Sequence, residues 1–216
     1  MRQISTGKFL VLGLASSCLL WSTAKASPLN LVPLSNVPDF KGSFIGLSYD
    51  STNENFQALG YTTDYTNGSV SLQDAGAYTL TATISHSGVL SAGTLTINGD
   101  IGAGVTTLLT GNLNAVGSGD NGGDIFEFSF TVTGGDPVVV NDFGGIGANS
   151  GGVILIAWFG DGDVPFTGSW ASNFNNSGTG SGAADSTLVA VPEPSTCGLL
   201  LAGLAVLLAV ARHKKR

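Results

Sequence analysis

Cysteine and positive charge are both scarce in this chain of 216 residues. The two cysteines, Cys18 and Cys197, lie near the two ends, so the long central part has none and cannot be cross-linked by disulfides. Between Ser27 and Pro194 the only positively charged residue is Lys41, against 15 Asp and Glu, which gives a formal charge of −14. Because binding to nucleic acid needs a basic surface, no nucleic-acid partner is expected.

Long hydrophobic runs are also confined to the two ends. Residues 1–26 have the three-part layout of a secretory signal peptide: a basic start, an apolar core over 9–21, and small residues at Ala24 and Ala26 where a signal peptidase reads the chain. This layout predicts export and cleavage after Ala26. A lipoprotein acylated at Cys18 is the alternative, but apolar residues continue after that cysteine, where a mature chain should begin.

The C-terminal residues 191–216 combine a Val-Pro-Glu-Pro segment, an apolar run over 197–211 and a basic end. A helix over the run would be about 22 Å long, short for a hydrocarbon core of about 30 Å, so a marginal single transmembrane helix is predicted. Positive residues beside a span stay in the cytoplasm, which puts the rest of the chain outside the inner membrane. The residues that stop transfer are Arg212, Lys214, Lys215 and Arg216.

The order of these parts resembles the PEP-CTERM sorting signal of Gram-negative bacteria. The resemblance implies that an exosortase, a membrane transpeptidase, recognises Pro192, Glu193 and Pro194 and cuts nearby. It further implies an inner-membrane precursor, then a place in the envelope, on the outer surface or in the extracellular matrix, often beside exopolysaccharide and biofilm production. An ordinary tail anchor with a proline-bearing linker is the alternative.

The central part, residues 27–171, is predicted to be one all-β ectodomain. Tyr78 to Ser85 and Phe126 to Thr133 alternate apolar and polar residues, which is typical of half-buried strands. The continuous apolar run from Val153 to Phe159 predicts a strand covered on both faces. Weaker strand candidates are Ser43 to Tyr49, Phe56 to Thr62, Ser69 to Gln73, Gly93 to Ile97, Thr106 to Leu113, Val138 to Val140 and Phe166 to Ala171. Many short strands separated by Gly and Asn turns predict an antiparallel β-sandwich or jelly roll.

Residues 172–190 are rich in Gly, Ser and Asn. This composition is typical of a flexible linker, with a reach of about 20 Å between ectodomain and membrane. The first half of the segment could instead pair as a last strand.

Few residues of the central part suggest catalysis or metal binding. Its one histidine, His86, lies in a Ser- and Gly-rich turn, so an exposed position is expected rather than a catalytic triad. No catalytic residue and no cofactor are predicted. Calcium is the one ion that could bind, either in the loop of Asp120 and Asp124 or in the loop of Asp161 and Asp163. Ordinary turns explain both loops as well.

The sequence thus favours an exported, non-enzymatic surface or matrix protein with a structural or adhesive role. Its expected partners are signal peptidase, an exosortase, the inner membrane in passing, and exopolysaccharide. A carbohydrate-binding module, with or without calcium, is the second hypothesis, and an exposed aromatic row would support it while buried tryptophans would count against it. The candidate aromatic residues are Trp158, Trp170, Tyr61 and Tyr65, with core packing favoured for Trp158. A secreted glycoside hydrolase, which needs two facing carboxyl groups, is the third.

Overall fold

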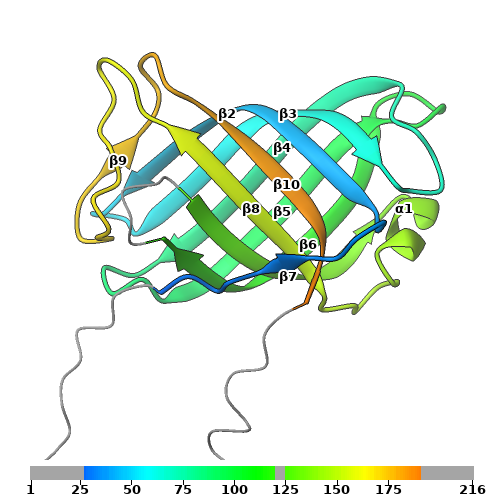
Figure 1. The fold of residues 1–216 in the computed structure, drawn as a ribbon, viewed down its shortest axis with the longest axis horizontal. Helices are drawn as coiled ribbons and strands as arrows, with labels where there is room; N and C mark the ends of the chain where they lie inside the picture. The colour runs from blue at the N-terminus through cyan, green and yellow to red at the C-terminus, as the bar shows by residue number, and fades with distance from the viewer. Residues whose placement is uncertain (1–26, 120–124, 191–216) are drawn as a thin grey trace, which may run out of the picture.

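A computed structural model describes residues 27–119 and 125–190 of the chain. This part contains ten strands and one short helix (Figure 1). The elements are β1 (Val32–Pro33), β2 (Asp39–Asp50), β3 (Asn55–Thr66), β4 (Asp74–Ile84), β5 (Leu90–Asp100), β6 (Thr106–Ser118), β7 (Ile125–Gly135), α1 (Pro137–Asp142), β8 (Gly151–Trp158), β9 (Phe174–Asn175) and β10 (Ser181–Ala190).

The strands form one closed antiparallel barrel. Strands β2 to β8 pair in chain order, each with the next, and β10 lies between β8 and β2 (Figure 1). The wall therefore has eight strands, and the predicted sandwich or jelly roll is wrong. Strand number and turn spacing are alike in sandwiches and barrels; the difference here is that the last strand pairs with the first.

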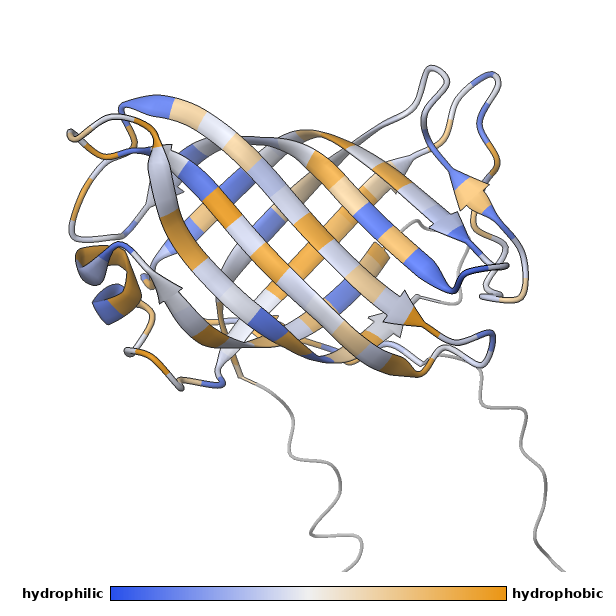
Figure 2. Cartoon of the chain, turned by 180° about the vertical axis from the view of Figure 1, so that it is seen from behind, coloured by the Kyte–Doolittle hydropathy of each residue, from blue (hydrophilic) through white to orange (hydrophobic). Residues whose placement is uncertain are grey.

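Side chains alternate between the barrel interior and its outer surface. Hydrophobic and hydrophilic residues follow one another along the strands in Figure 2. On β7, Phe126, Phe128 and Phe130 are fully buried, as the alternating pattern predicted. An eight-stranded barrel is just wide enough for side chains to fill it. The interior is correspondingly packed with aromatic and branched residues from every strand of the wall.

Aromatic residues also fill both ends of the barrel. At the end near α1, Phe143 stacks on Phe40 with ring centroids 5.9 Å apart. At the opposite end the segment between β8 and β10 folds inward and buries Phe166, Trp170 and Phe174, with Trp170 and Phe174 5.5 Å apart. The predicted strand Phe166 to Ala171 is wrong, because these residues form part of this irregular plug.

Helix α1 replaces another predicted strand, Val138 to Val140. The side chain of Asp136 caps the helix by accepting a 2.9 Å hydrogen bond from the Val138 N–H, and Pro137 occupies the first turn. An aspartate followed by proline is a helix-start signal, which here outweighs the strand preference of three valines. The loop after α1 leads back to β8.

The segment 172–190 is not a flexible linker, since it contains β9 and β10. Strand β10 pairs with β8 from Ser181 to Leu188 and with β2 from Ala183 to Thr187. Glycine at position 182 serves close packing here: an added Cβ would lie 2.8 Å from the carbonyl oxygen of Ile45. Glycine suggested a flexible linker from the sequence, but in the structure it lets β10 pack closely against its neighbouring strands.

The predicted signal peptide 1–26 and the predicted transmembrane helix 197–211 lie outside the described residues. Within residues 27–119 and 125–190, no helix has the length and apolar character needed to cross a membrane.

Two phenylalanines allow a matched test of this core. Phe56 is fully buried and Phe44 is 74% exposed. We expect Phe56→Ala to lower the free energy of unfolding by about 3–5 kcal/mol, because it leaves a cavity in the barrel. Phe44→Ala should change it by less than about 0.5 kcal/mol. Urea denaturation of the two variants measures both, and equal losses would contradict the assigned packing.

Candidate binding face on the barrel wall

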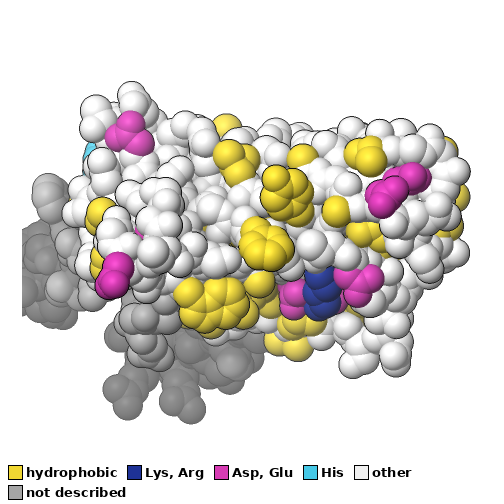
Figure 3. All heavy atoms as spheres, turned by 90° about the horizontal axis from the view of Figure 1, so that it is seen from above, with side chains coloured by type: hydrophobic (Ala, Val, Ile, Leu, Met, Phe, Trp, Pro, Cys, Tyr) yellow, Lys and Arg dark blue, Asp and Glu magenta, His cyan; other side chains and the backbone are white. Residues whose placement is uncertain are grey.

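The outer wall of the barrel carries a row of exposed apolar side chains. We call it the apolar row; its members are Ile125 on β7, Ile156 and Trp158 on β8, Phe44 on β2, and Leu59 and Tyr61 on β3. Figure 3 shows apolar side chains gathered in a diagonal band across one face, beside a lysine flanked by two acidic groups. That lysine is Lys41, the only Lys or Arg in the described part.

Strand register makes the row continuous. Ile125 pairs with Ile156, and Ile156 pairs in turn with Ala183 of β10. Ala183 also pairs with Ser43, the neighbour of Phe44, and Ser43 pairs with Tyr61. Neighbouring strands lie about 4.8 Å apart, so the row crosses four strand intervals, or about 19 Å.

The exposed area of the row is comparable with the largest apolar patch of an ordinary monomeric protein. Phe44 is 74%, Tyr61 58% and Trp158 54% exposed. Since an aromatic side chain offers about 150–250 Å² for burial, the three rings alone expose roughly 370 Å². Apolar patches of this size are often functional.

Phe44 is held outward by an unusual backbone. Its φ of 54° lies in the left-handed region, and the register between β2 and β3 shifts between Ser43 and Gly46. A side chain other than glycine in this region costs about 1–2 kcal/mol, and bulges of this kind redirect side chains next to functional sites. The strained residue gains no burial in return, so its ring is a candidate binding group.

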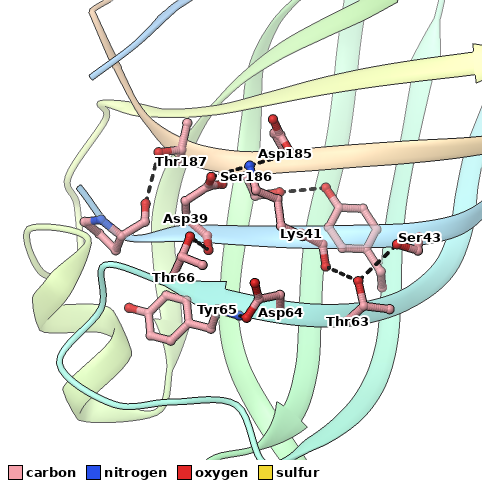
Figure 4. A network of polar contacts seen from close by, with 12 residues as sticks. Asp39, Lys41, Ser43, Thr63, Asp64, Tyr65, Thr66, Asp185, Ser186 and Thr187 are labelled. Carbon is pink, nitrogen blue, oxygen red and sulfur yellow. Dashed lines mark hydrogen bonds and ion pairs between the residues drawn. The ribbon is translucent and has the colours of Figure 1, made fainter. Parts of the chain in front are cut away.

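A charged cluster borders the row on the same face. The Lys41 Nζ lies 2.5 Å from Asp39 Oδ2 and 2.9 Å from Asp185 Oδ1, and Lys41 pairs directly with Asp185 in the strand register (Figure 4). Burial raises the pKa of Asp39, although Lys41 partly offsets it. Burial alone would lower the pKa of Lys41, but its bonds to Asp39 and Asp185 outweigh that and raise the pKa. The lysine is therefore charged and already neutralised.

Behind this cluster, a polar contact inside the barrel joins β10 to β4. The hydroxyls of Tyr78 on β4 and Ser186 on β10 lie 2.7 Å apart in a buried position, and burial raises the pKa of Tyr78. Between β10 and the start of β2, the Thr187 hydroxyl donates a 3.0 Å hydrogen bond to the Pro38 carbonyl. Side-chain bonds thus tie β10 both to β2 and to β4, which holds the wall under the apolar row in one shape.

Several carboxylates that could have served in catalysis or metal binding instead accept hydrogen bonds from the protein's own backbone. Asp163 accepts hydrogen bonds from the N–H groups of Gly160 and Gly178, and the bond from Gly160 is the main cause of its lowered pKa. Glu127 accepts from the N–H groups of Asn30 and Leu31.

Asp142 has a similar role beside α1. Its carboxylate accepts a 2.9 Å hydrogen bond from the Tyr65 hydroxyl and a 2.8 Å bond from the Ser69 N–H. Burial acts to raise the pKa of Asp142, but the bonds from Ser69 and Tyr65 outweigh it and the pKa is lowered. These bonds anchor the helix to β3, which contains Tyr65, and to the loop after β3, which contains Ser69.

No group of three or more His, Cys, Asp or Glu able to hold a metal occurs within residues 27–119 and 125–190. At the predicted calcium loop of Asp161 and Asp163, both oxygens of Asp163 are bonded to backbone N–H groups. Asp120 and Asp124, the other predicted calcium ligands, lie outside the described residues, and calcium binding there stays a prediction.

The aromatic candidates from the sequence fall into two sets. Trp158 and Tyr61 lie exposed on the apolar row, whereas Trp170 and Tyr65 are buried. Core packing for Trp158 was therefore wrong, because from Val153 onward β8 buries every second residue, and the residues between them, Ile156 and Trp158 among them, are apolar members of the exposed row or partly buried. Phe44 was not predicted as an exposed binding residue. Two adjacent apolar residues, Phe44 and Ile45, break the alternation of apolar and polar residues along β2, and this break is the signal that could have identified it.

His86 is exposed in the turn after β4, as predicted, and its Nδ1 lies 3.2 Å from Glu54 Oε1. The signal-cleavage residues Ala24 and Ala26, the motif Pro192, Glu193 and Pro194, and the basic end from Arg212 to Arg216 are outside the described residues.

The chain beyond the barrel identifies the class of protein. Residues 190–216 match the family model of the PEP-CTERM protein-sorting motif, starting at the last residue of β10. A chain with this motif is exported, crosses the membrane and is sorted to the cell surface by an exosortase. The C-terminal segment carries the PEP-CTERM protein-sorting motif, as the sequence resemblance indicated. No curated protein and no solved structure matches it.

The charged cluster allows a pH-dependent test. We expect Lys41→Gln to lower the free energy of unfolding at pH 7 by about 1–2 kcal/mol, because it leaves the half-buried Asp39 charged and unpaired. The pKa of Asp39 is already raised above its ordinary value, so its charge is unfavourable in the folded state and protonation relieves it. The loss should therefore shrink as the pH falls toward 4.

The matched control is the double variant Asp39→Asn with Lys41→Gln, which removes the less exposed of the two carboxylates, leaves only the more exposed Asp185 without its partner, and should recover most of the stability at pH 7. Urea denaturation across pH 4–7 measures both variants. A loss in Lys41→Gln that is the same at every pH would disprove this role for Asp39.

Proposed function

We propose that this protein is a non-enzymatic component of the cell surface or extracellular matrix, where the barrel acts as an adhesive or structural module. The observation that carries the proposal is the apolar row, with its three exposed aromatic rings and the strained backbone at Phe44. A surface protein with such a patch is expected to contact another macromolecule through it.

The packing of the barrel supports binding on the outside rather than within. Aromatic side chains fill the interior, and Phe143 at one end and Trp170 at the other are buried against them. A ligand inside would have to displace well-packed rings, each of which contributes several kcal/mol to stability. The outer wall needs no such rearrangement.

A non-enzymatic role is supported by what the carboxylates do. Asp142, Asp163 and Glu127 accept hydrogen bonds from backbone N–H groups, which are structural roles. Asp39 and Asp185 share Lys41 between them. A glycosidase needs one protonated and one ionised carboxyl group free to face the substrate, and these pairings disfavour that arrangement.

The position of the sorting motif fits a folded cargo. Strand β10 ends at Ala190, and only Val191 separates it from Pro192. A cut at or beyond the motif would leave the strand, and with it the closed barrel, intact. A cut several residues upstream would remove part of β10.

Mass spectrometry of the mature protein tests the sorting proposal. We expect a chain that begins at Ser27 and has lost the residues after Pro194 in cells with an active exosortase. The variant in which Pro192, Glu193 and Pro194 are all replaced by alanine should keep its C-terminal residues. Arg216 still attached in the mature wild-type population would refute exosortase processing.

A further inference from the structure

We propose that the apolar row binds a neutral polysaccharide chain, whose sugar rings stack on Trp158, Phe44 and Tyr61. The inference rests on the proposed function, because it assumes that the mature barrel exposes this wall at the cell surface. It adds to that function a ligand class and the three side chains that recognise it.

The spacing of the aromatic residues suits an extended ligand. Trp158 on β8 pairs with Ser181, and Tyr61 on β3 pairs with Ser43. Strands β8 and β3 are three strand intervals apart, with β10 and β2 between them, which is about 14 Å. The outward residues of β10 at this level, Ser181 and Ala183, are small. A chain lying across the strands can therefore touch rings on both sides without meeting a bulky side chain between them.

The chemistry of the face suits sugars. A pyranose ring has an apolar C–H face, which packs on aromatic rings, and a rim of hydroxyls, which needs hydrogen-bonding partners. Stacking on aromatic side chains tolerates many ring types because it depends on the flat face. Next to Tyr61, the exposed hydroxyls of Ser43 and Thr63 lie 3.0 Å apart and offer donors and acceptors at the edge of the row (Figure 4).

Charge favours a neutral ligand over the other candidates. The single cation of this face, Lys41, is already neutralised by Asp39 and Asp185. Residues 27–194 carry a formal charge of −14, which repels anionic polysaccharides, anionic lipid surfaces and a second copy of the chain. A neutral polysaccharide meets none of this repulsion.

The size of the row also favours a narrow ligand. A stable protein interface buries about 800 Å² on each partner. The three aromatic rings expose roughly 370 Å², and the three aliphatic members, each less than half exposed, add a smaller area. The row by itself is therefore smaller than a whole protein interface and is sufficient for a few sugar units.

The test uses the mature protein and isothermal titration calorimetry. The neutral probes are a soluble β-1,4-glucan, a galactomannan and dextran; alginate and vesicles of anionic phospholipid represent the charged alternatives. We expect binding to at least one neutral probe and none to the charged ones. Trp158→Ala, Phe44→Ala and Tyr61→Ala should each weaken it by about tenfold or more.

Two control variants separate ring stacking from general apolar contact. Leu59→Ala removes an aliphatic member of the row, and Ile146→Ala removes an exposed residue in the loop after α1. Ile146→Ala should bind the neutral probe within about twofold of wild type, and Leu59→Ala should weaken binding less than each aromatic variant does, whereas a second copy docking on the row would be weakened by Leu59→Ala as much as by the aromatic variants. Near-ultraviolet circular dichroism checks that each variant is folded.

Three results would overturn the proposal: no binding to any neutral probe, binding only to alginate or vesicles, or a concentration-dependent increase in mass that Trp158→Ala and Leu59→Ala abolish equally. Each leaves the mass-spectrometric test of sorting unaffected. Failure of this inference can therefore be distinguished from failure of the proposed sorting and surface function.

Discussion

The structure depends on the pairing of β10 with both β8 and β2. Without this strand the barrel would have two open edges, and the aromatic interior would meet water along one side. Close packing at Gly182, the buried contact between Ser186 and Tyr78 of β4, and the ion pair between Lys41 and Asp185 all hold β10 in place. An unpaired edge strand invites pairing with another chain, and closure of the barrel removes such an edge from the wall.

Closure also determines the candidate binding face. The apolar row draws its members from β7 and β8 on one side of β10 and from β2 and β3 on the other, which are far apart in the chain. Only the closing strand brings Trp158 and Phe44 onto one wall. The residues that match the sorting motif begin at Ala190, the last residue of the strand that completes the fold.

Local patterns predicted the elements that depend on local forces. The alternation in Tyr78 to Ser85 and in Phe126 to Thr133 identified β4 and β7, because one face of each strand is buried in the interior and the other is not. The prediction failed where tertiary contacts override composition. Residues 172–190 look flexible because they are rich in glycine and serine, yet strands on both sides of β10 hold it in place.

The sequence by itself identified the sorting motif and, with it, export to the cell surface, because such a motif is read as a short linear segment that requires no fold. It also determined that the body is built of strands, since alternation of side chains is a local property. Only the tertiary structure decided between sandwich and barrel, and which tryptophan is buried. Trp158 lies near the end of an apolar run and Trp170 stands among Gly, Ser and Asn, yet Trp158 is exposed and Trp170 is buried. Whether each meets solvent depends on strands many residues away.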